Sequence, residues 1–295
     1  MKKILVLGGV SYDTIVHLNH LPDPVSQTIY GQEYQTIGST GAGKALNLTK
    51  LGIPNTLHAT LGTDEYGLKI QEFLKSMDVE GVYDLDQFTE RHVNLMDQEG
   101  GRISIFTAST TNHPILDMAR LENLIETSDL VVLNIVPYTK QLIPLIKKHH
   151  KEIWTDLHDY EEGNPYYDDF IKAADCLFFS SDRAVNHRQL MQKWLDDGKK
   201  MIVVTHGKNG ASVANSQGFY YEPIINTYQM VDSNGAGDAF FSAFLYGYLA
   251  LEPVQKCLAY GTIAGGLTVS SKELVSPLLS EQYLLEKYLE IYHEN

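Results

Sequence analysis

The sequence predicts an α/β protein, with a central, mostly parallel sheet flanked by helices and a small second sheet that serves as a lid. Short apolar runs alternate with helical or turn-rich segments from residue 130 onward, as in a parallel sheet with crossover helices. Segments 14–37 and 88–108 instead alternate polar and apolar residues, as half-exposed antiparallel strands do. We therefore expect one domain over residues 1–295 with a lid formed by about 14–37 and 88–108.

Composition narrows the functional classes. The chain has a formal net charge of −14, which disfavours non-specific binding of nucleic acid or anionic membranes. Its two cysteines lie far apart in sequence and indicate neither a disulfide framework nor a zinc site. The longest apolar run, 239–251, is too short to span a bilayer, and the N-terminal apolar run is too short for a signal peptide. We expect a cytoplasmic protein.

The first predicted strand, 4–7, is a continuous apolar run that ends at Gly8-Gly9, as expected of a strand buried on both faces. Asp13 follows within a few residues. Ligands of open α/β sheets bind beyond the carboxyl ends of strands, so Asp13 is a candidate ligand-binding carboxylate. A surface loop aspartate is the alternative. After it, two short stretches separated by Pro22 and Pro24 predict the first lid strands.

Residues 38–52 form a glycine-rich stretch that leads into a helix ending at Gly52. Gly38, Gly43 and Lys44 satisfy the G-x-x-x-x-G-K pattern of a P-loop, but Ala45 stands where that motif needs Ser or Thr to hold magnesium. The preceding segment is also a weak strand. A flexible hinge before a helix is therefore the preferred interpretation, with Lys44 a helix residue outside the phosphate site.

The middle of the chain continues both patterns. A strand is predicted at 56–61, followed by a helix whose inward face carries Leu68, Ile70, Phe73, Leu74 and Met77. Segments 93–97 and 102–107 flank Gln-Glu-Gly-Gly as a hairpin that joins the lid. Parallel strands follow at 130–136, 153–157, 176–179 and 201–205. Asp156 ends one of them and is within reach of a metal or phosphate site.

Two glycine-rich turns are candidate anion sites. Residues 203–211 run from a strand through Gly207 and Gly210 into another short strand, and Thr205 and Lys208 are placed to assist at a nucleotide phosphate. A simple hairpin that needs its glycines for positive φ is the alternative.

The stretch 230–241 is the stronger candidate. Gly235 and Gly237 stand where a loop turns into a helix, so unpaired backbone N–H groups and the helix dipole favour a phosphate there. Asp238, in the first helical turn, is well placed to take a proton from a hydroxyl that attacks a phosphoryl group. The residues therefore suggest phosphoryl transfer, with Asp238 as base and residues 235–237 as anion hole. A plain turn with an N-cap is the competing interpretation.

Together these motifs resemble the ribokinase-like family, which includes carbohydrate kinases of the phosphofructokinase B type, over nearly the whole chain. Residues 232–240, Asp-Ser-Asn-Gly-Ala-Gly-Asp-Ala-Phe, are close to the specific family signature Asp-Thr-x-Gly-Ala-Gly-Asp-x-Phe. Residues 205–210 resemble the family's nucleotide loop, 8–13 its first strand with the substrate aspartate, and 38–52 its hinge signature.

The resemblance implies a Rossmann-like sheet with a small β-lid, ATP as donor, Mg²⁺, and a sugar or nucleoside hydroxyl as acceptor. The implied residues, grouped by role, are Asp238, Gly235, Ala236 and Gly237 for catalysis; Asp13, Ser11, Gly38, Ser39, Gly41 and Gly43 for the substrate; Thr205, Gly207, Lys208, Gly210, Asn234 and Ser180 for the nucleotide; and Asp232 and Asp182 for the metal. Exposed lid edges favour a homodimer.

The chain departs from the family at the positions that choose a substrate. Gly43 stands at the substrate-contacting asparagine, and Ser180-Ser-Asp182-Arg183 replaces the family's Asn-x-x-Glu motif. Ribose is therefore not the expected acceptor, and Tyr12, Tyr34, Asn94 and His113 are the candidates to line its pocket.

Three alternatives to a sugar kinase remain open at this point: a nucleoside kinase of the same fold, a non-catalytic ligand sensor on this scaffold, and a P-loop NTPase. The departures at Gly43 and at 180–183 motivate the sensor, and the residues 38–44 motivate the P-loop enzyme.

Overall fold

The computed structural model describes residues 2–98, 100–184 and 186–293, and the large sheet that runs through its centre has nine strands. Their spatial order is β13-β12-β11-β10-β9-β8-β1-β4-β5, and all neighbours are parallel except β11-β12 and β12-β13. The strands are β1 (Ile4–Leu7), β4 (Asn55–Leu61), β5 (Glu80–Leu85), β8 (Leu130–Leu133), β9 (Glu152–Asp156), β10 (Cys176–Ser180), β11 (Met201–Thr205), β12 (Ala211–Asn215) and β13 (Gly218–Glu222).

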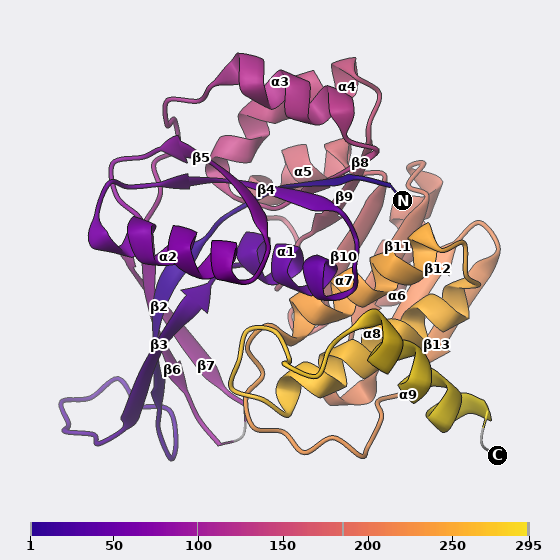
Figure 1. Ribbon diagram of the computed structural model, residues 1–295. Coiled ribbons are helices and arrows are strands. Elements are labelled where there is room, and N and C mark those ends of the chain that lie inside the picture. Colours follow the sequence, from indigo (N-terminus) through magenta and orange to yellow (C-terminus); the bar gives the residue numbers. More distant parts are fainter. Residues whose placement is uncertain (1, 99, 185, 294–295) are drawn as a thin grey trace.

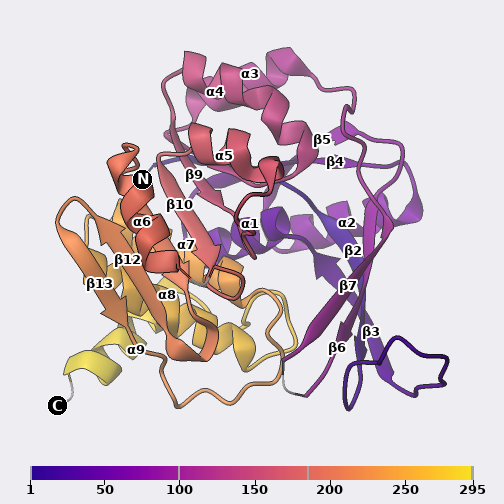
Figure 2. The ribbon, with the colours of Figure 1, turned by 180° about the vertical axis from the view of Figure 1, so that it is seen from behind.

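Helices cover both faces of this sheet (Figures 1 and 2). The side chains of β1 alternate between two cores: Ile4 and Val6 belong to one, Leu5 and Leu7 to the other. The first core is closed by α1 (Thr40–Lys50), α2 (Glu65–Ser76), α7 (Ala236–Leu249), α8 (Val254–Val269) and α9 (Glu281–His293). The second is closed by α3 (Met118–Thr127), α4 (Ile143–Lys148), α5 (Asp168–Ala173) and α6 (His187–Asp196), with short 3₁₀ turns at Pro137–Leu142, Pro165–Tyr167 and Gly207–Asn209.

A separate four-stranded sheet projects from one side of this body (Figure 1). Its order is β3-β2-β6-β7, with β2 and β3 antiparallel, β6 and β7 antiparallel, and β2 and β6 parallel. The strands are β2 (Ser11–His17), β3 (Gln32–Gly38), β6 (Glu90–Met96) and β7 (Arg102–Ala108). The edge strand β7 is exposed along almost its whole length, so it does not alternate between buried and exposed positions as a strand with one solvated face would.

The fold class predicted from sequence is confirmed, and several local predictions need correction. Asp13 does not end a strand of the large sheet; it lies inside β2, because the chain passes through Gly8-Gly9 directly into the small sheet. Leu68 is 60 % exposed, unlike the buried Ile70 and Leu74 that share its helix. The strands β5 and β13 were not anticipated, because neither contains the continuous aliphatic run of a buried strand.

Two negative findings concern the described residues only. No helix among them is long and apolar enough to cross a bilayer. Both cysteines, Cys176 and Cys257, are free and buried. Glu99, in the predicted hairpin turn, lies outside the described residues.

Candidate active site

The glycine-rich loop enters α7 through Gly235, the N-cap residue, whose φ of 77° lies in the left-handed region. A Cβ at this position would overlap the carbonyl oxygen of Leu274, so both conformation and space require glycine. Ala236, Gly237 and Asp238 form the first helical turn, where N–H groups have no partner within the helix. Gly237 is exposed, and the N–H of Ala236 donates to the carbonyl of Ser233 at 3.4 Å. The anion hole at this helix start stays a prediction.

Asp238 is buried behind this turn and is bound by a lysine from another helix. The Nζ of Lys44, in α1, lies 2.6 Å from Oδ1 of Asp238 and 3.1 Å from Oδ2 of Asp156, at the end of β9. Lys44 is completely buried, and its Nζ also lies 5.0 Å from the centre of the Phe241 ring. Lys44 is a helix residue, as predicted, but its contact with the predicted base Asp238 was not anticipated.

A signal for this placement was present in the sequence. Lys44 shares one face of α1 with Leu48 and Leu51, four and seven positions later, and that face is buried. A lysine on an inward helical face needs a carboxylate partner. The P-loop alternative also fails here, because a buried, doubly paired lysine is not free to hold phosphates and β3 is an edge strand of the small sheet.

Burial and charge act against each other in this cluster. Burial raises the pKa of Asp238, and the positive charges of Lys44 and of His158, when His158 is protonated, only partly offset it. For Asp156, burial also raises the pKa, but His158 and Lys44 outweigh it, so the pKa of Asp156 falls below its usual value. Burial lowers the pKa of Lys44, yet the two carboxylates outweigh burial and raise it. Lys44 is consequently a fixed cation.

The predicted substrate carboxylate, Asp13, is buried in the small sheet among polar neighbours. Asn94 donates a hydrogen bond from Nδ2 to Asp13 Oδ2 at 3.1 Å, and His92 Nδ1 lies 3.1 Å from Asp13 Oδ1. The other ring nitrogen of His92 is 3.2 Å from Glu90 Oε1. Burial lowers the pKa of His92, but its two carboxylate partners outweigh burial and raise it to about 9. The hydroxyl of Ser11, also buried, has no hydrogen-bond partner among the described residues.

The hinge between β3 and α1 runs past both carboxylates. A Cβ on Gly38 would overlap Asp13, and a Cβ on Gly43 would overlap Oδ2 of Asp238. A Cβ on Gly41 would meet the backbone of Gly9. Ser39, between them, has a φ of 68°. The structure thus brings the predicted substrate and catalytic residues to one short segment, where the chain needs residues without side chains.

Five of the six predicted nucleotide residues lie at the ends of two neighbouring strands or in the turn that follows one of them, and the sixth, Asn234, lies in the loop before α7. Ser180 and Thr205 are register partners at the ends of β10 and β11. The turn after Thr205 contains Gly207 and Gly210, both with positive φ, and Lys208 is exposed there. His206, which the sequence did not suggest, contacts the hydroxyls of Ser181 and Ser212, each at 2.9 Å.

The two predicted metal ligands have different surroundings. Asp232 is buried and accepts hydrogen bonds from the backbone N–H of Asn234 at 2.8 Å and from the Tyr34 hydroxyl of β3 at 3.1 Å. His17 Nε2 of β2 lies 3.5 Å from the same carboxylate. Asp182 is exposed on the turn after β10. Within the described part of the chain, no three His, Cys, Asp or Glu side chains gather as a ready metal site.

The remaining pocket candidates are dispersed. The Tyr12 hydroxyl donates to Gln35 Oε1 at 3.3 Å and the Tyr12 ring packs 5.3 Å from that of Tyr66, whereas His113 is exposed in the loop before α3. Asn94 and Tyr34 are the two candidates that touch predicted site carboxylates.

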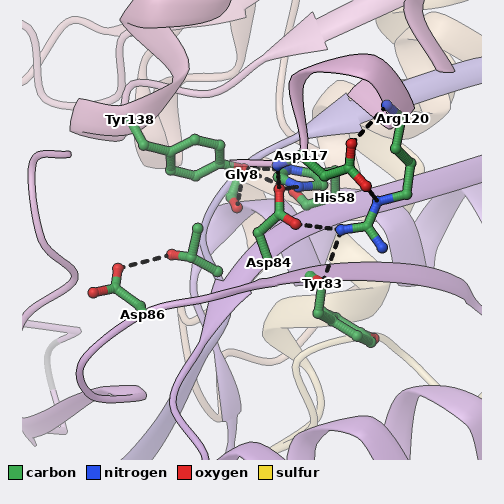
Figure 3. A network of polar contacts seen from close by, with 9 residues as sticks. Gly8, His58, Tyr83, Asp84, Asp86, Asp117, Arg120 and Tyr138 are labelled. Atoms are coloured by element: carbon green, nitrogen blue, oxygen red, sulfur yellow. Dashed lines mark hydrogen bonds and ion pairs between the residues drawn. The ribbon is translucent and has the colours of Figure 1, made fainter. Parts of the chain in front are cut away.

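A second buried polar network lies beside β4 and β5 (Figure 3). His58 contacts the Tyr138 hydroxyl through Nδ1 at 3.1 Å and Asp84 through Nε2 at 3.1 Å, and Arg120 pairs with Asp84. The Tyr138 hydroxyl donates to the carbonyl of Gly8, at the end of β1. None of these residues was a predicted site residue. The network holds the end of β1 from which the chain enters the small sheet.

The chain is similar in sequence and in fold to known proteins. The sequence profile of the pfkB family carbohydrate kinases matches residues 1–281. An acarbose 7(IV)-phosphotransferase from an Actinoplanes species is 30% identical over 270 residues, covering 89% of this chain and 90% of that protein. The structure of a microbiome-derived acarbose kinase superposes with a TM-score of 0.86 at 27% identity, covering 97% and 98% of the two chains. Ribokinase from Arabidopsis thaliana, solved with ribose and ATP, gives 0.79 at 21% identity over 97% and 98%.

Proposed function

This chain belongs to the pfkB family of carbohydrate kinases, and on that premise we propose that Asp238 is the base with which it transfers the γ-phosphoryl group of ATP to a sugar hydroxyl. The observation that carries the proposal is the burial of Asp238 in the first turn of α7, where backbone N–H groups have no partner within the helix. The same turn thus supplies a proton acceptor and an anion hole.

The reaction requires positioning and charge stabilisation more than covalent chemistry by the protein. The acceptor O–H gives its proton to Asp238 while the acceptor oxygen bonds to phosphorus and the bond to ADP breaks. The N–H donors of the first α7 turn stabilise the negative charge on the transferred group. Ser180, Thr205, Gly207, Lys208, Gly210 and Asn234 are the residues we propose for the nucleotide.

A sugar is the acceptor class we favour over a nucleoside. Asp13, Asn94 and the unpartnered hydroxyl of Ser11 offer the carboxylate, amide and hydroxyl groups that recognise several neighbouring hydroxyls. The acarbose phosphotransferase and kinase are similar to this chain over nearly their whole length, which makes acarbose the first acceptor to test. Gly38, Ser39, Gly41 and Gly43 would let the acceptor approach the backbone.

Mg²⁺ is the metal we propose, held mainly by nucleotide phosphates. Magnesium in kinase sites keeps waters and takes one or two protein carboxylates, so it does not need a three-residue cluster. Asp232 and Asp182 are the proposed carboxylates. Asp232 already accepts hydrogen bonds from Tyr34 and Asn234, so it fits a role through a water better than direct coordination. When bound, the metal would neutralise phosphate charge.

We propose that the small sheet is a lid over the acceptor and that it also mediates dimer formation. Tyr34 and His17 reach from the sheet to Asp232, as a lid in contact with the site would. The edge strand β7 exposes Ile105 and Phe106, 46% and 60% accessible, so it offers a pairing surface to a second copy. Sedimentation velocity tests the dimer.

We also propose that the protein is cytoplasmic, because it uses ATP. Its net charge of −14 supports the absence of a nucleic-acid or membrane partner.

The deciding experiment is an ADP-release screen with ATP, Mg²⁺ and acarbose, other sugars, sugar phosphates and nucleosides, run with the wild-type protein and Asp238→Asn. We expect one acceptor class to stimulate release and Asp238→Asn to lower kcat about 10²–10⁴-fold with ATP binding retained. Most of the activity surviving in this variant would refute the base assignment. ADP release that only nucleosides stimulate would show that the acceptor is a nucleoside and not a sugar. Ligands that raise the melting temperature without any ADP release would indicate a non-catalytic sensor.

A further inference from the structure

Lys44 is the one fully buried lysine among the described residues, and it stands between two carboxylates from different elements. It comes from α1, Asp238 from α7 and Asp156 from the end of β9. The distances of 2.6 and 3.1 Å are those of charge-assisted hydrogen bonds. The cluster therefore ties the base to both the hinge helix and the central sheet.

The groups that face Asp238 carry a small net charge. Lys44 is the cation, Asp156 the second anion, and His158 approaches Asp156 Oδ2 with Nδ1 at 3.3 Å. Burial lowers the pKa of His158, so it contributes little charge at neutral pH. Lys44 is consequently the charge that opposes the effect of burial on Asp238. The aromatic ring of Phe241 covers the remaining side of the ammonium.

The two oxygens of Asp238 have different surroundings. Oδ1 accepts the short hydrogen bond from Lys44. Oδ2 faces Gly43, where even a single Cβ would overlap it. Asp238 therefore keeps this position only because residue 43 has no side chain, and Oδ2 is the oxygen that Lys44 does not bind.

We propose that Lys44 is a positioning residue for phosphoryl transfer: it fixes Asp238 through Oδ1, so that Oδ2 receives the proton of the acceptor hydroxyl. This rests on the proposed role of Asp238 as base. Lys44 keeps its own protons throughout. The acceptor proton goes to Oδ2, the acceptor oxygen forms the new bond to phosphorus, and ADP leaves with the electron pair of the broken bond. Asp156 fixes Lys44 in turn.

The proposed role of Lys44 predicts a shift of the pH–rate profile that a loss of packing alone would not cause. Removing Lys44 leaves burial and Asp156 acting on Asp238, so the pKa of Asp238 rises further and the base is protonated over more of the acidic range. Removing the charge of Asp156 acts in the opposite direction, because Asp156 raises the pKa of Asp238. The acidic limb of the pH–rate profile should therefore move to higher pH in Lys44→Met and to lower pH in Asp156→Asn.

The test measures kcat and kcat/KM between pH 5 and 9 for ADP release from ATP, with acarbose and with water alone as acceptor, in full-length protein. We expect Lys44→Met to lower kcat about 10–100-fold at neutral pH, to recover partly at high pH, and to shift the limb by about one unit or more. Lys44→Arg should return kcat to within about tenfold of wild type. Lys50→Met, at the end of the same helix, is the matched control and should behave as wild type.

Three results distinguish a wrong role for Lys44 from a wrong assignment of Asp238 as base. If the acidic limb of the pH–rate profile does not move in either Lys44→Met or Asp156→Asn, and Asp238→Asn is inactive, the proposed role of Lys44 is overturned. The assignment of Asp238 as base is then unaffected. An active Asp238→Asn would overturn the proposed function itself. If Lys44→Met does not fold, the downward shift expected in Asp156→Asn still decides, and its absence would refute the proposal.

Discussion

Asp232 and Asp238 belong to the same glycine-rich stretch, but different parts of the molecule hold them. Asp238 is bound by Lys44 and lies against the core of the large sheet. Asp232 is bound by Tyr34 and approached by His17, both from the small sheet. Lys44 is fully buried, whereas β3, which carries Tyr34, is largely exposed. The first carboxylate therefore has a fixed geometry, and the second depends on where the small sheet lies.

The largest effect is expected from a substitution that displaces Asp238, the carboxylate with the fixed geometry. Gly43→Ala adds a Cβ that would overlap Asp238 Oδ2, and because Lys44 holds Oδ1 the carboxylate has little freedom to move away. We expect kcat to fall about 10²-fold or more, since misplacement of a base by about 1 Å has effects of this size. Steady-state ADP release measures it. Gly265→Ala, whose Cβ would meet Ala236 O at an ordinary 3.4 Å, is the matched control. Equal activity in both variants would contradict this interpretation.

A smaller effect is expected from removing the contact between the small sheet and Asp232. Tyr34→Phe removes the hydroxyl whose oxygen lies 3.1 Å from both Asp232 Oδ2 and the carbonyl oxygen of Lys272 and whose single proton can be donated to either. One hydrogen bond of this kind is worth about 0.5–1.5 kcal/mol, so kcat/KM should fall about 3–10-fold while the acidic limb stays in place. Tyr30→Phe, a 90% exposed tyrosine in the loop before β3, is the control. A limb that moves in Tyr34→Phe would link the two carboxylates more tightly than we propose.

The smallest effect concerns the stability of the small sheet. His92 has a pKa of about 9 in the folded protein because its carboxylate partners outweigh burial, against about 6.5 when unfolded. Its contribution is fully present below pH 6.5 and is lost as the pH rises to about 9, so the wild type should lose roughly 1–3 kcal/mol of unfolding free energy over that range. His92→Gln should show a flatter dependence in denaturant titrations at pH 6, 7.5 and 9. The exposed His20→Gln should keep the wild-type slope, and identical slopes in all three proteins would count against the assignment.

The sequence was most informative where local chemistry dictates structure. The apolar runs predicted most strands of the large sheet, and glycines in a polar loop before an apolar helix predicted the turn at Gly235. Such features depend on neighbours in sequence, so they can be inferred without coordinates.

Contacts between distant segments could not be inferred in the same way. Lys44 and Asp238 are separated by 194 positions, and nothing local to either identifies its partner. The sequence analysis predicted a helix at Lys44 but not that its side chain would be buried against Asp238. Asp13 was placed at the end of a buried strand because the direct passage from β1 into the small sheet leaves no sequence signal beyond Gly8-Gly9.

The two buried cysteines make the chain convenient for spectroscopy. Burial raises the pKa of both thiols, that of Cys257 to about 12, so neither ionises readily near neutral pH. Maleimide dyes react with accessible thiolates, and the natural protein should therefore stay almost unlabelled. One cysteine introduced on the exposed face of β7 and one on the surface of α6 would then carry a donor and acceptor pair without removing any native residue of the core. The distance between the two dyes, measured in single molecules during turnover, would report how the small sheet moves relative to the large sheet.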